Sequence, residues 1–182
     1  MVLEQFGDRD VYERLEEALL AGRVSYRNLM EGEFATVHAS LDEVNAFLAE
    51  GVELRPGFDR LAALQPLILS SGFHELIEPV LARHGADLEV RANRIETGSD
   101  GWRIRWRNEA VCAECGNLCK RGSLPDDRPL AFVGDGYSDR CAALACDRVF
   151  ARDSLATYLD SQQVAYERFE TFDDVADALD AE

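Results

Sequence analysis

The pattern of apolar and polar positions divides the chain into two parts. In the first part, apolar side chains recur at the three- and four-residue spacing of amphipathic helices. Three short helices are predicted: one within residues 2–20, a second that opens at Ser25, and a third that begins at a capping box of Ser40 and Glu43. The third helix is expected to end at Gly51 in a left-handed cap. Residues 1–55 therefore form a small helical unit.

After Arg55-Pro56-Gly57 the pattern changes to an alternation of apolar strands and helices. Strands are predicted at 66–69, 130–133, 148–151 and 164–168. Helices are predicted at 73–84, interrupted or restarted at Pro79, and at 138–146, 153–161 and 172–180. Residues 88–107 are expected to form a ribbon that turns at 98–101, with its tryptophans packed on one face. Such alternation predicts an α/β fold, a Rossmann-like core at 56–182 with a mostly parallel sheet and ligands at the carboxyl ends of its strands.

Charge limits the classes of partner. The chain of 182 residues carries 19 basic and 35 acidic residues, a formal net charge of −16. This surface repels nucleic acid, whose binding needs lysine and arginine on phosphates. No run of 18 apolar residues or signal-like N-terminus is present, so neither a membrane span nor secretion is expected. An acidic surface with a single lysine predicts a cytoplasmic protein of a salt-rich cell; codon bias would explain the arginines but not the excess of acids.

The strongest candidate for chemistry is the segment Leu130-Ala-Phe-Val-Gly-Asp-Gly-Tyr-Ser-Asp139. An apolar strand here would carry Asp135 and Asp139 to its carboxyl end, before a helix that Ser138 can cap. Carboxylates together with water and phosphate oxygens are the ligands that Mg²⁺ prefers. The alternative interpretation is a surface turn rich in glycine and aspartate.

Two weaker signals accompany this motif. Ser70, Ser71 and Gly72 follow a short apolar strand and precede a helix, where hydroxyl and backbone N–H groups can hold a phosphate. A simple helix cap is the alternative. Lys120 is the single lysine of the chain, which indicates a position where a compact ammonium is needed, or a chance survivor on the surface.

Taken in chain order, these motifs resemble those of the haloacid dehalogenase superfamily. A serine at one strand end, a lysine about 50 residues later and Gly-Asp-Gly-x-Ser-Asp at a second strand end match its second, third and fourth motifs. Three further segments restrict the resemblance to one branch of the superfamily: Trp102-Arg-Ile-Arg-Trp106, residues 112–120 and Val149-Phe-Ala-Arg-Asp153. They point to the phosphoserine-phosphatase-like branch and, within it, to the 2-hydroxy-3-keto-5-methylthiopentenyl-1-phosphate phosphatase group.

The resemblance implies a Mg²⁺-dependent phosphomonoesterase acting on a small phosphorylated metabolite such as one of methionine salvage, with phosphoserine as the alternative substrate. Ser70, with Ser71 and Gly72, would bind the transferring phosphoryl group, and Lys120 would neutralise charge on phosphate and carboxylate. Asp135 would hold Mg²⁺, and Asp139 would support the metal or Lys120. The helical residues 1–55 would be the cap that closes over substrate.

The sequence departs from this family at the nucleophile. The family's apolar strand followed by Asp-x-Asp-x-Thr or Val has no counterpart; Asp8-Arg9-Asp10 lacks such a strand and is rejected. The central strand between those ending at Ser70 and Asp135 is therefore expected to be absent. A late start site or a shortened form is the preferred explanation. The alternative is a catalytically inactive relative that binds phosphate or a protein partner.

The cysteines carry a separate question. Cys112, Cys115 and Cys119 have metal-like spacing, but a structural zinc site needs four ligands and no second cysteine or histidine pair follows. Cys141 and Cys146 are assigned to a core helix. A thiol-lined loop that positions Lys120 is therefore favoured over a zinc site.

Overall fold

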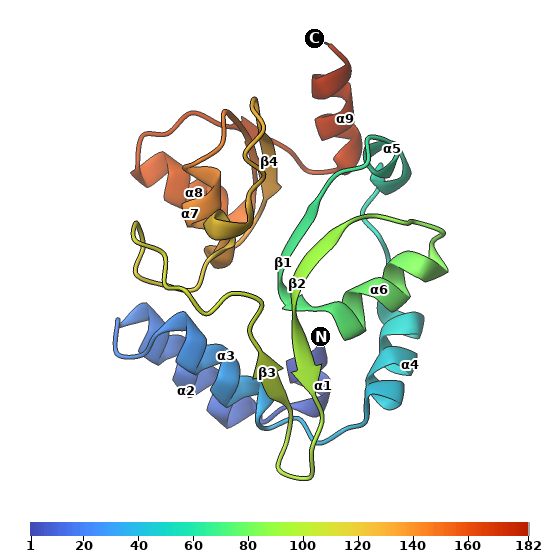
Figure 1. Ribbon diagram of the computed structural model, residues 1–182, viewed down its shortest axis with the longest axis vertical. Coiled ribbons are helices and arrows are strands. Elements are labelled where there is room, and N and C mark those ends of the chain that lie inside the picture. The colour runs from blue at the N-terminus through green and yellow to red at the C-terminus, as the bar shows by residue number, and fades with distance from the viewer. Residues whose placement is uncertain (182) are drawn as a thin grey trace.

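A computed structural model describes residues 1–181 of the chain (Figure 1). The first helices are α1 (Val2–Phe6), α2 (Arg9–Leu20), α3 (Tyr26–Phe34) and α4 (Leu41–Gly51). The later helices are α5 (Phe58–Ala63), α6 (His74–Arg83), α7 (Arg140–Ala143), α8 (Asp153–Ser161) and α9 (Phe172–Asp180). Two 3₁₀ turns are η1 (Lys120–Ser123) and η2 (Tyr137–Asp139). The strands are β1 (Ile68–Phe73), β2 (Val90–Glu96), β3 (Arg103–Arg105), β4 (Ala131–Gly134), β5 (Arg148–Ala151) and β6 (Glu167–Arg168).

The strands form two sheets, in the orders β1-β2-β3 and β4-β5-β6. β1 pairs with β2 in parallel, as β5 does with both β4 and β6. β3 returns antiparallel on β2, which confirms the predicted ribbon. The α/β fold with mostly parallel strands is therefore confirmed. Within residues 1–181 no ladder joins the two sheets, so β1 and β4, the strands with the Ser70 and Asp135 motifs, are both edge strands.

In Figure 1, β4 lies on the opposite side of β1 from β2. Edge strands present unpaired backbone N–H and C=O groups along one side. The Ser70 and Asp135 motifs therefore both lie on strands with one unpaired edge.

The helices of the first part and the first sheet share one apolar core. It includes Val37, Val44 and Phe73, which are almost fully buried, and Trp102, which is 1% exposed. The Trp102 indole N–H donates to the carbonyl of Ala39, 2.8 Å away. Burial with a satisfied N–H is typical of a structural tryptophan. The prediction that the ribbon tryptophans pack inward is confirmed for Trp102.

A second core lies between the other sheet and its helices. Val149, Ala151, Leu155 and Leu159 from β5 and α8 are buried in it, and α9 packs against α5. Within residues 1–181 no helix has the length and apolar character needed to cross a bilayer.

The helix boundaries test the capping predictions directly. Ser25 caps α3 by accepting from the N–H of Asn28, and Ser40 with Glu43 forms the full capping box of α4. The prediction that α4 ends at Gly51 is confirmed, but the prediction of a left-handed cap there is wrong. Gly51 is the last residue of α4, and the cap is Val52 in an extended conformation. Glycine permits a left-handed cap but does not impose one.

The prediction that Pro79 interrupts the helix at 73–84 is also wrong, since α6 is continuous through it. Proline has no N–H, so the carbonyl of Glu75, four residues earlier, loses its usual helical donor. The side-chain amide of Asn45 on α4 donates to that carbonyl at 3.1 Å. A neighbouring helix therefore replaces the hydrogen bond that proline removes.

Candidate active site

The carboxyl end of β1 brings Ser70, Ser71 and Gly72 to the start of α6. The strand extends to Phe73, further than predicted, and the Ser70 hydroxyl accepts a hydrogen bond from the Gly72 N–H at 3.0 Å. The side-chain amide of Asn93 on β2 donates to the carbonyl of Ser71 at 2.9 Å. The two serines are therefore held between their own turn and the neighbouring strand.

Lys120 and Asp139 form the most buried ion pair of the site. The Lys120 Nζ lies 2.6 Å from Asp139 Oδ1, and the two side chains are 13% and 5% exposed. The other oxygen of Asp139 accepts from the backbone N–H groups of Asp135 and Gly136, at 3.0 and 2.9 Å. Asp139, and not Ser138 as predicted, therefore closes the turn after β4. The predicted helix 138–146 is correspondingly short, with η2 followed by the four residues of α7.

Asp135 differs from Asp139 in its surroundings. It lies just beyond β4 and is exposed. Its backbone carbonyl accepts from the N–H of Leu155 at 3.0 Å and from the Ser154 hydroxyl. Within residues 1–181 no protein group donates a hydrogen bond to its carboxylate. That carboxylate is therefore free to accept a ligand from solvent.

A small cavity of about 20 Å³ connects the β1 end with Lys120. Ser70, Ser71 and Lys120 line it together with Asn93 and Arg107. Ser70 and Lys120, fifty residues apart in the sequence, are thus brought together, as the resemblance implies. Gly72 does not line the cavity, but its N–H donates to the Ser70 hydroxyl, which does. Asp139 is connected to the cavity by its ion pair with Lys120, and Asp135 does not line it.

Asn93 and Arg107 are functional candidates that the sequence analysis missed. Asn93 is buried in the middle of β2, and its side-chain oxygen Oδ1 accepts from the Arg107 backbone N–H at 3.1 Å. The Arg107 Nε is buried with no hydrogen-bond partner. Burial, followed by the positive charge of Arg91, lowers the pKa of Arg107. In the sequence, Arg107 alternates with Trp106 in the same way as Arg103 and Arg105 alternate with their apolar neighbours, so nothing marks it out. The one signal of this polar pocket is the asparagine in the predicted ribbon.

Tyr26 brings the helical part of the chain to the site. Its hydroxyl lies near the side chains of Ser71 at the end of β1 and Ser138 after β4. Burial raises the pKa of this phenol, against a lowering effect of Ser71. Its ring stacks on Tyr137 with 5.8 Å between centroids. One residue of α3 therefore touches both sheets where the predicted site residues lie.

The rejected motif Asp8-Arg9-Asp10 has a purely local role. The Asp8 carboxylate accepts from the N–H groups of Asp10 and Val11 at the start of α2. It caps a helix in the way expected for this residue type.

The donor set offers Mg²⁺ one side-chain carboxylate. Asp135 fits, because Mg²⁺ is commonly held by one or two carboxylates and completed by water and phosphate oxygens. Asp139 fits less well, because both of its oxygens already accept from Lys120 and two N–H groups. Around Asp135, within residues 1–181, no group of three histidine, cysteine or acidic ligands forms.

Comparison with known proteins gives a consistent set of relatives. The chain is 27% identical over 179 residues to Pdp3-interacting factor 1 of Schizosaccharomyces pombe, covering 88% of this chain and 78% of that one. It is 26% identical to 2-hydroxy-3-keto-5-methylthiopentenyl-1-phosphate phosphatase of Exiguobacterium sibiricum, covering 98% and 87%. The Bacillus mycoides protein of that name is also 26% identical, covering 96% and 85%. No protein-family profile matches the chain.

Solved structures share the fold at lower identity. Phosphoserine phosphatase from T. onnurineus, in complex with NDSB-201, superposes with a TM-score of 0.63 at 19% identity, covering 93% of this chain and 80% of that one. A probable phosphoserine phosphatase from Vibrio cholerae, in unliganded form, gives a TM-score of 0.65 at 16% identity, covering 92% and 55%. These structures establish the fold on which the site is built.

Proposed function

The chain is a homologue of haloacid dehalogenase-like phosphatases and has their fold, and from this premise we propose that it is a phosphoric monoester hydrolase for a small phosphorylated metabolite. The observation that carries the proposal is the Lys120–Asp139 ion pair beside a cavity lined by Ser70 and Ser71. A buried ammonium next to hydroxyl groups at a helix start suits a phosphoryl dianion.

Each residue has a distinct task in this proposal. The Ser70 hydroxyl exchanges its bond with Gly72 for one to a phosphoryl oxygen, and the Lys120 ammonium neutralises charge on that group. Asp139 is a positioning residue, because its contact with two backbone N–H groups fixes the point from which it holds Lys120.

Asp135 is the residue that would hold Mg²⁺. Its free, exposed carboxylate lies at the carboxyl end of β4, where ligands of parallel sheets bind. The bound ion would supply positive charge to the phosphate oxygens.

The nucleophile is the missing part of the reaction. In the described residues 1–181, no strand ends in the Asp-x-Asp pair that the resemblance implies, and β1 and β4 are both left as sheet edges. We propose that hydrolysis needs a strand with this pair between β1 and β4. The first aspartate would attack phosphorus and the second would protonate the leaving group.

Two substrates are candidates. Relatives that match nearly the whole chain are named for 2-hydroxy-3-keto-5-methylthiopentenyl-1-phosphate, whereas the two solved structures are named for phosphoserine. We favour the first, because those relatives are more similar in sequence. A cytoplasmic location in a salt-rich cell is retained as a prediction from the net charge of −16.

A second candidate function is non-catalytic binding of phosphate or a protein. It is favoured by the lack of an Asp-x-Asp strand and by the relative named as an interacting factor. In that case the Lys120 cavity would bind a phosphate without turning it over.

One pair of measurements separates these functions. Vanadate, a phosphate mimic, is titrated into the chain, and hydrolysis of p-nitrophenyl phosphate with Mg²⁺ is measured for the chain and for a form extended by an Asp-x-Asp-x-Thr strand. The phosphatase proposal predicts vanadate binding by both forms and EDTA-sensitive turnover by the extended form alone. Binding without turnover in either form would support the second candidate. Robust turnover by the unextended chain would contradict the need for the strand.

A further inference from the structure

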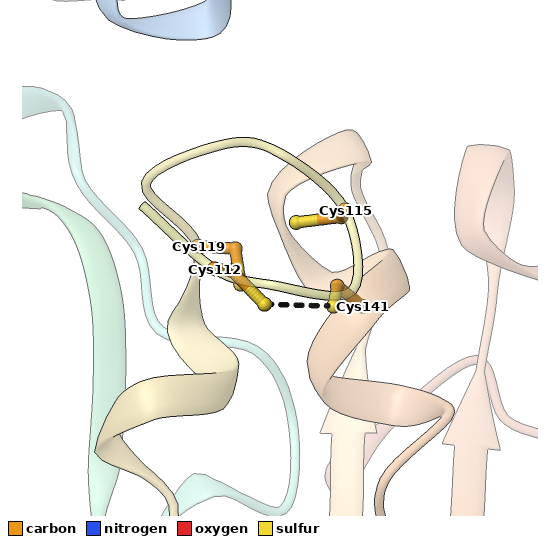
Figure 2. Close-up of side chains that lie close together, drawn as sticks. All are labelled: Cys112, Cys115, Cys119 and Cys141. Atoms are coloured by element: carbon orange, nitrogen blue, oxygen red, sulfur yellow. Dashed lines mark hydrogen bonds between the residues drawn. The ribbon is translucent and has the colours of Figure 1, made fainter. Parts of the chain in front are cut away.

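Four cysteines converge at one point beside the candidate active site (Figure 2). Cys112, Cys115 and Cys119 come from the loop before η1, and Cys141 comes from α7. The four sulfur atoms lie within 4.8 Å of one another. The expectation that no fourth ligand is available is therefore wrong. Motif spacing does not identify the fourth ligand, Cys141, because β4 and the turn after it separate Cys141 from Cys119 in the sequence.

The sulfur geometry fits one tetrahedral metal ion. With zinc–sulfur bonds of about 2.3 Å, the edge of a four-thiolate tetrahedron is about 3.8 Å. The Cys112 and Cys141 sulfurs are 3.8 Å apart. That separation is far beyond the ~2.0 Å of a disulfide bond, and all the cysteines of the chain are free.

The loop that carries the first three cysteines contains a tight turn. The Gly116 N–H donates to the Cys112 carbonyl at 2.9 Å, and the Cys112 N–H donates to the Asn117 carbonyl at 3.0 Å. Gly116 has a φ of +67°, a conformation that favours glycine. The turn folds the chain back on itself between Cys112 and Cys119, and the sulfur atoms of the loop lie close together as a result.

The surrounding chain also explains why a crosslink would be useful. Residues 106–130 contain one 3₁₀ turn and no other regular element. A segment of this kind buries little apolar surface, so a metal ion that crosslinks it to the rest of the fold would stabilise its conformation. Arg121 lines the same cavity as Cys141, which places a positive charge beside the cluster. The fifth cysteine, Cys146, is elsewhere on the chain and faces the Ala142 carbonyl.

We propose that Cys112, Cys115, Cys119 and Cys141 bind one Zn²⁺ ion in a closed, four-thiolate structural site. On binding, each thiol releases its proton to solvent, and no electrons are transferred. Four protein ligands leave no open position for substrate, so the site is structural. Cys119 directly precedes Lys120, and Cys141 lies two residues after Asp139. The metal therefore fixes both sides of the Lys120–Asp139 ion pair to each other.

The test is the metal content of the full-length protein, prepared with a reductant and analysed by plasma mass spectrometry. We expect about one zinc per chain for the wild type. Cys115→Ser and Cys141→Ser should each lose most of it, and Cys146→Ser, the matched control, should keep it. Less than a tenth of an equivalent in folded, zinc-supplemented wild type would overturn the proposal, as would equal loss in Cys146→Ser.

A second measurement does not depend on variants that fold. Co²⁺ added to metal-free wild type should give the intense thiolate-to-cobalt charge-transfer band and the visible bands of a tetrahedral site. Octahedral cobalt spectra, iron or an iron–sulfur cluster in place of zinc, or a Cys112–Cys141 disulfide in the native protein would each contradict the assignment. Because neither readout uses phosphatase activity, the zinc site and the proposed function fail independently.

Discussion

Lys120 and Asp139 meet at 2.6 Å, almost out of contact with solvent, and this pair links the loop after β3 to the turn after β4. The other oxygen of Asp139 is bound by two backbone N–H groups, so the carboxylate stays in place whatever the lysine does. Such a carboxylate is a fixed anchor for a cation that must also contact a ligand. The pair therefore combines a structural role with the proposed binding of phosphate.

Replacing Lys120 should affect both roles. Lys120→Met leaves the buried Asp139 carboxylate without its cation, which should lower the free energy of unfolding by about 3 kcal/mol. This value is the lower end of the range for broken buried ion pairs, because two backbone N–H groups still donate to Asp139. The substitution should also abolish vanadate binding. The checks are chemical denaturation and vanadate titration. Arg9→Gln, which breaks the exposed Arg9–Glu13 pair, is the control and should cost less than about 1 kcal/mol. Retention of vanadate affinity in Lys120→Met would remove Lys120 from the site.

Glu33 predicts a pH dependence of stability. It is 4% exposed, its Oε1 has no hydrogen-bond partner, and burial, with a smaller effect of Glu16, raises its pKa from 4.5 to about 7. Tyr12 and Tyr26 are the other titratable groups that sense its charge. The folded state binds the proton of the Glu33 carboxyl group more tightly than the unfolded state does. The stability that this proton contributes is therefore fully present below pH 4.5 and is lost as pH rises to 7.

Glu33→Gln should remove this loss. We expect the free energy of unfolding of the variant to exceed that of the wild type by up to roughly 3 kcal/mol at pH 8, because the amide carries no charge to desolvate. Near pH 4.5 the two free energies of unfolding should match. Denaturant titrations at both pH values measure the difference. Asp42→Asn, at an exposed position, serves as the control. An equal effect of Glu33→Gln at both pH values would show that packing, and not ionisation, decides.

The parts of the fold that local sequence rules describe were predicted well. β5, α8 and α9 have the predicted bounds, and the caps at Ser25 and Ser40 are present. These features depend on residues within a few positions of one another, where periodicity and capping are physical constraints. The proximity of Ser70 and Lys120 was predicted from the order of their motifs along the chain, which resembles that of a known family.

The errors have a common cause in contacts between distant segments. The Glu75 carbonyl freed by Pro79 is satisfied by Asn45, thirty residues earlier. Arg107 is drawn inward by Asn93, and the fourth cysteine, Cys141, arrives on a different helix. None of these partners follows from local spacing. Such tertiary replacements override local propensity.

Arg60 should make stability depend on salt. It bridges from α5 to three carboxylates on one face of α9: Asp173, Asp177 and Asp180. Arg60→Gln leaves these charges to repel one another in a chain of net charge −16. Thermal unfolding should show a lower Tm for the variant at low ionic strength and a smaller difference in molar KCl, where the Debye length falls to about 3 Å.

The wild-type Tm should itself rise with KCl, because salt screens the excess of negative charge. Arg103→Gln, which breaks one exposed contact with Asp100, is the control and should change little. A gap between Arg60→Gln and wild type that is unchanged in molar KCl would mean that Arg60 acts through packing and not through charge.

Gly101 is the residue whose replacement should damage the first core most directly. It has a φ of +97°, and a Cβ atom there would lie 1.9 Å from the carbonyl oxygen of Ala35. The next residue, the buried Trp102, donates its backbone N–H to the carbonyl of Phe34 at 3.2 Å. A methyl group would therefore force the β3 entry away from the end of α3 and withdraw the indole from the core.

Gly22 supplies the matched comparison. It also has a positive φ, +68°, but nothing lies within 4 Å of an added Cβ. Gly22→Ala should therefore cost only the backbone strain, about 1 kcal/mol. Gly101→Ala should cost on the order of 3 kcal/mol or more, because the overlap is with backbone that cannot rotate away. For a chain of this size the difference in Tm should be at least roughly 5 °C. Equal Tm values for the two variants would mean that the backbone at the β3–α3 contact can move apart without loss of stability. The contact would then not stabilise the first core.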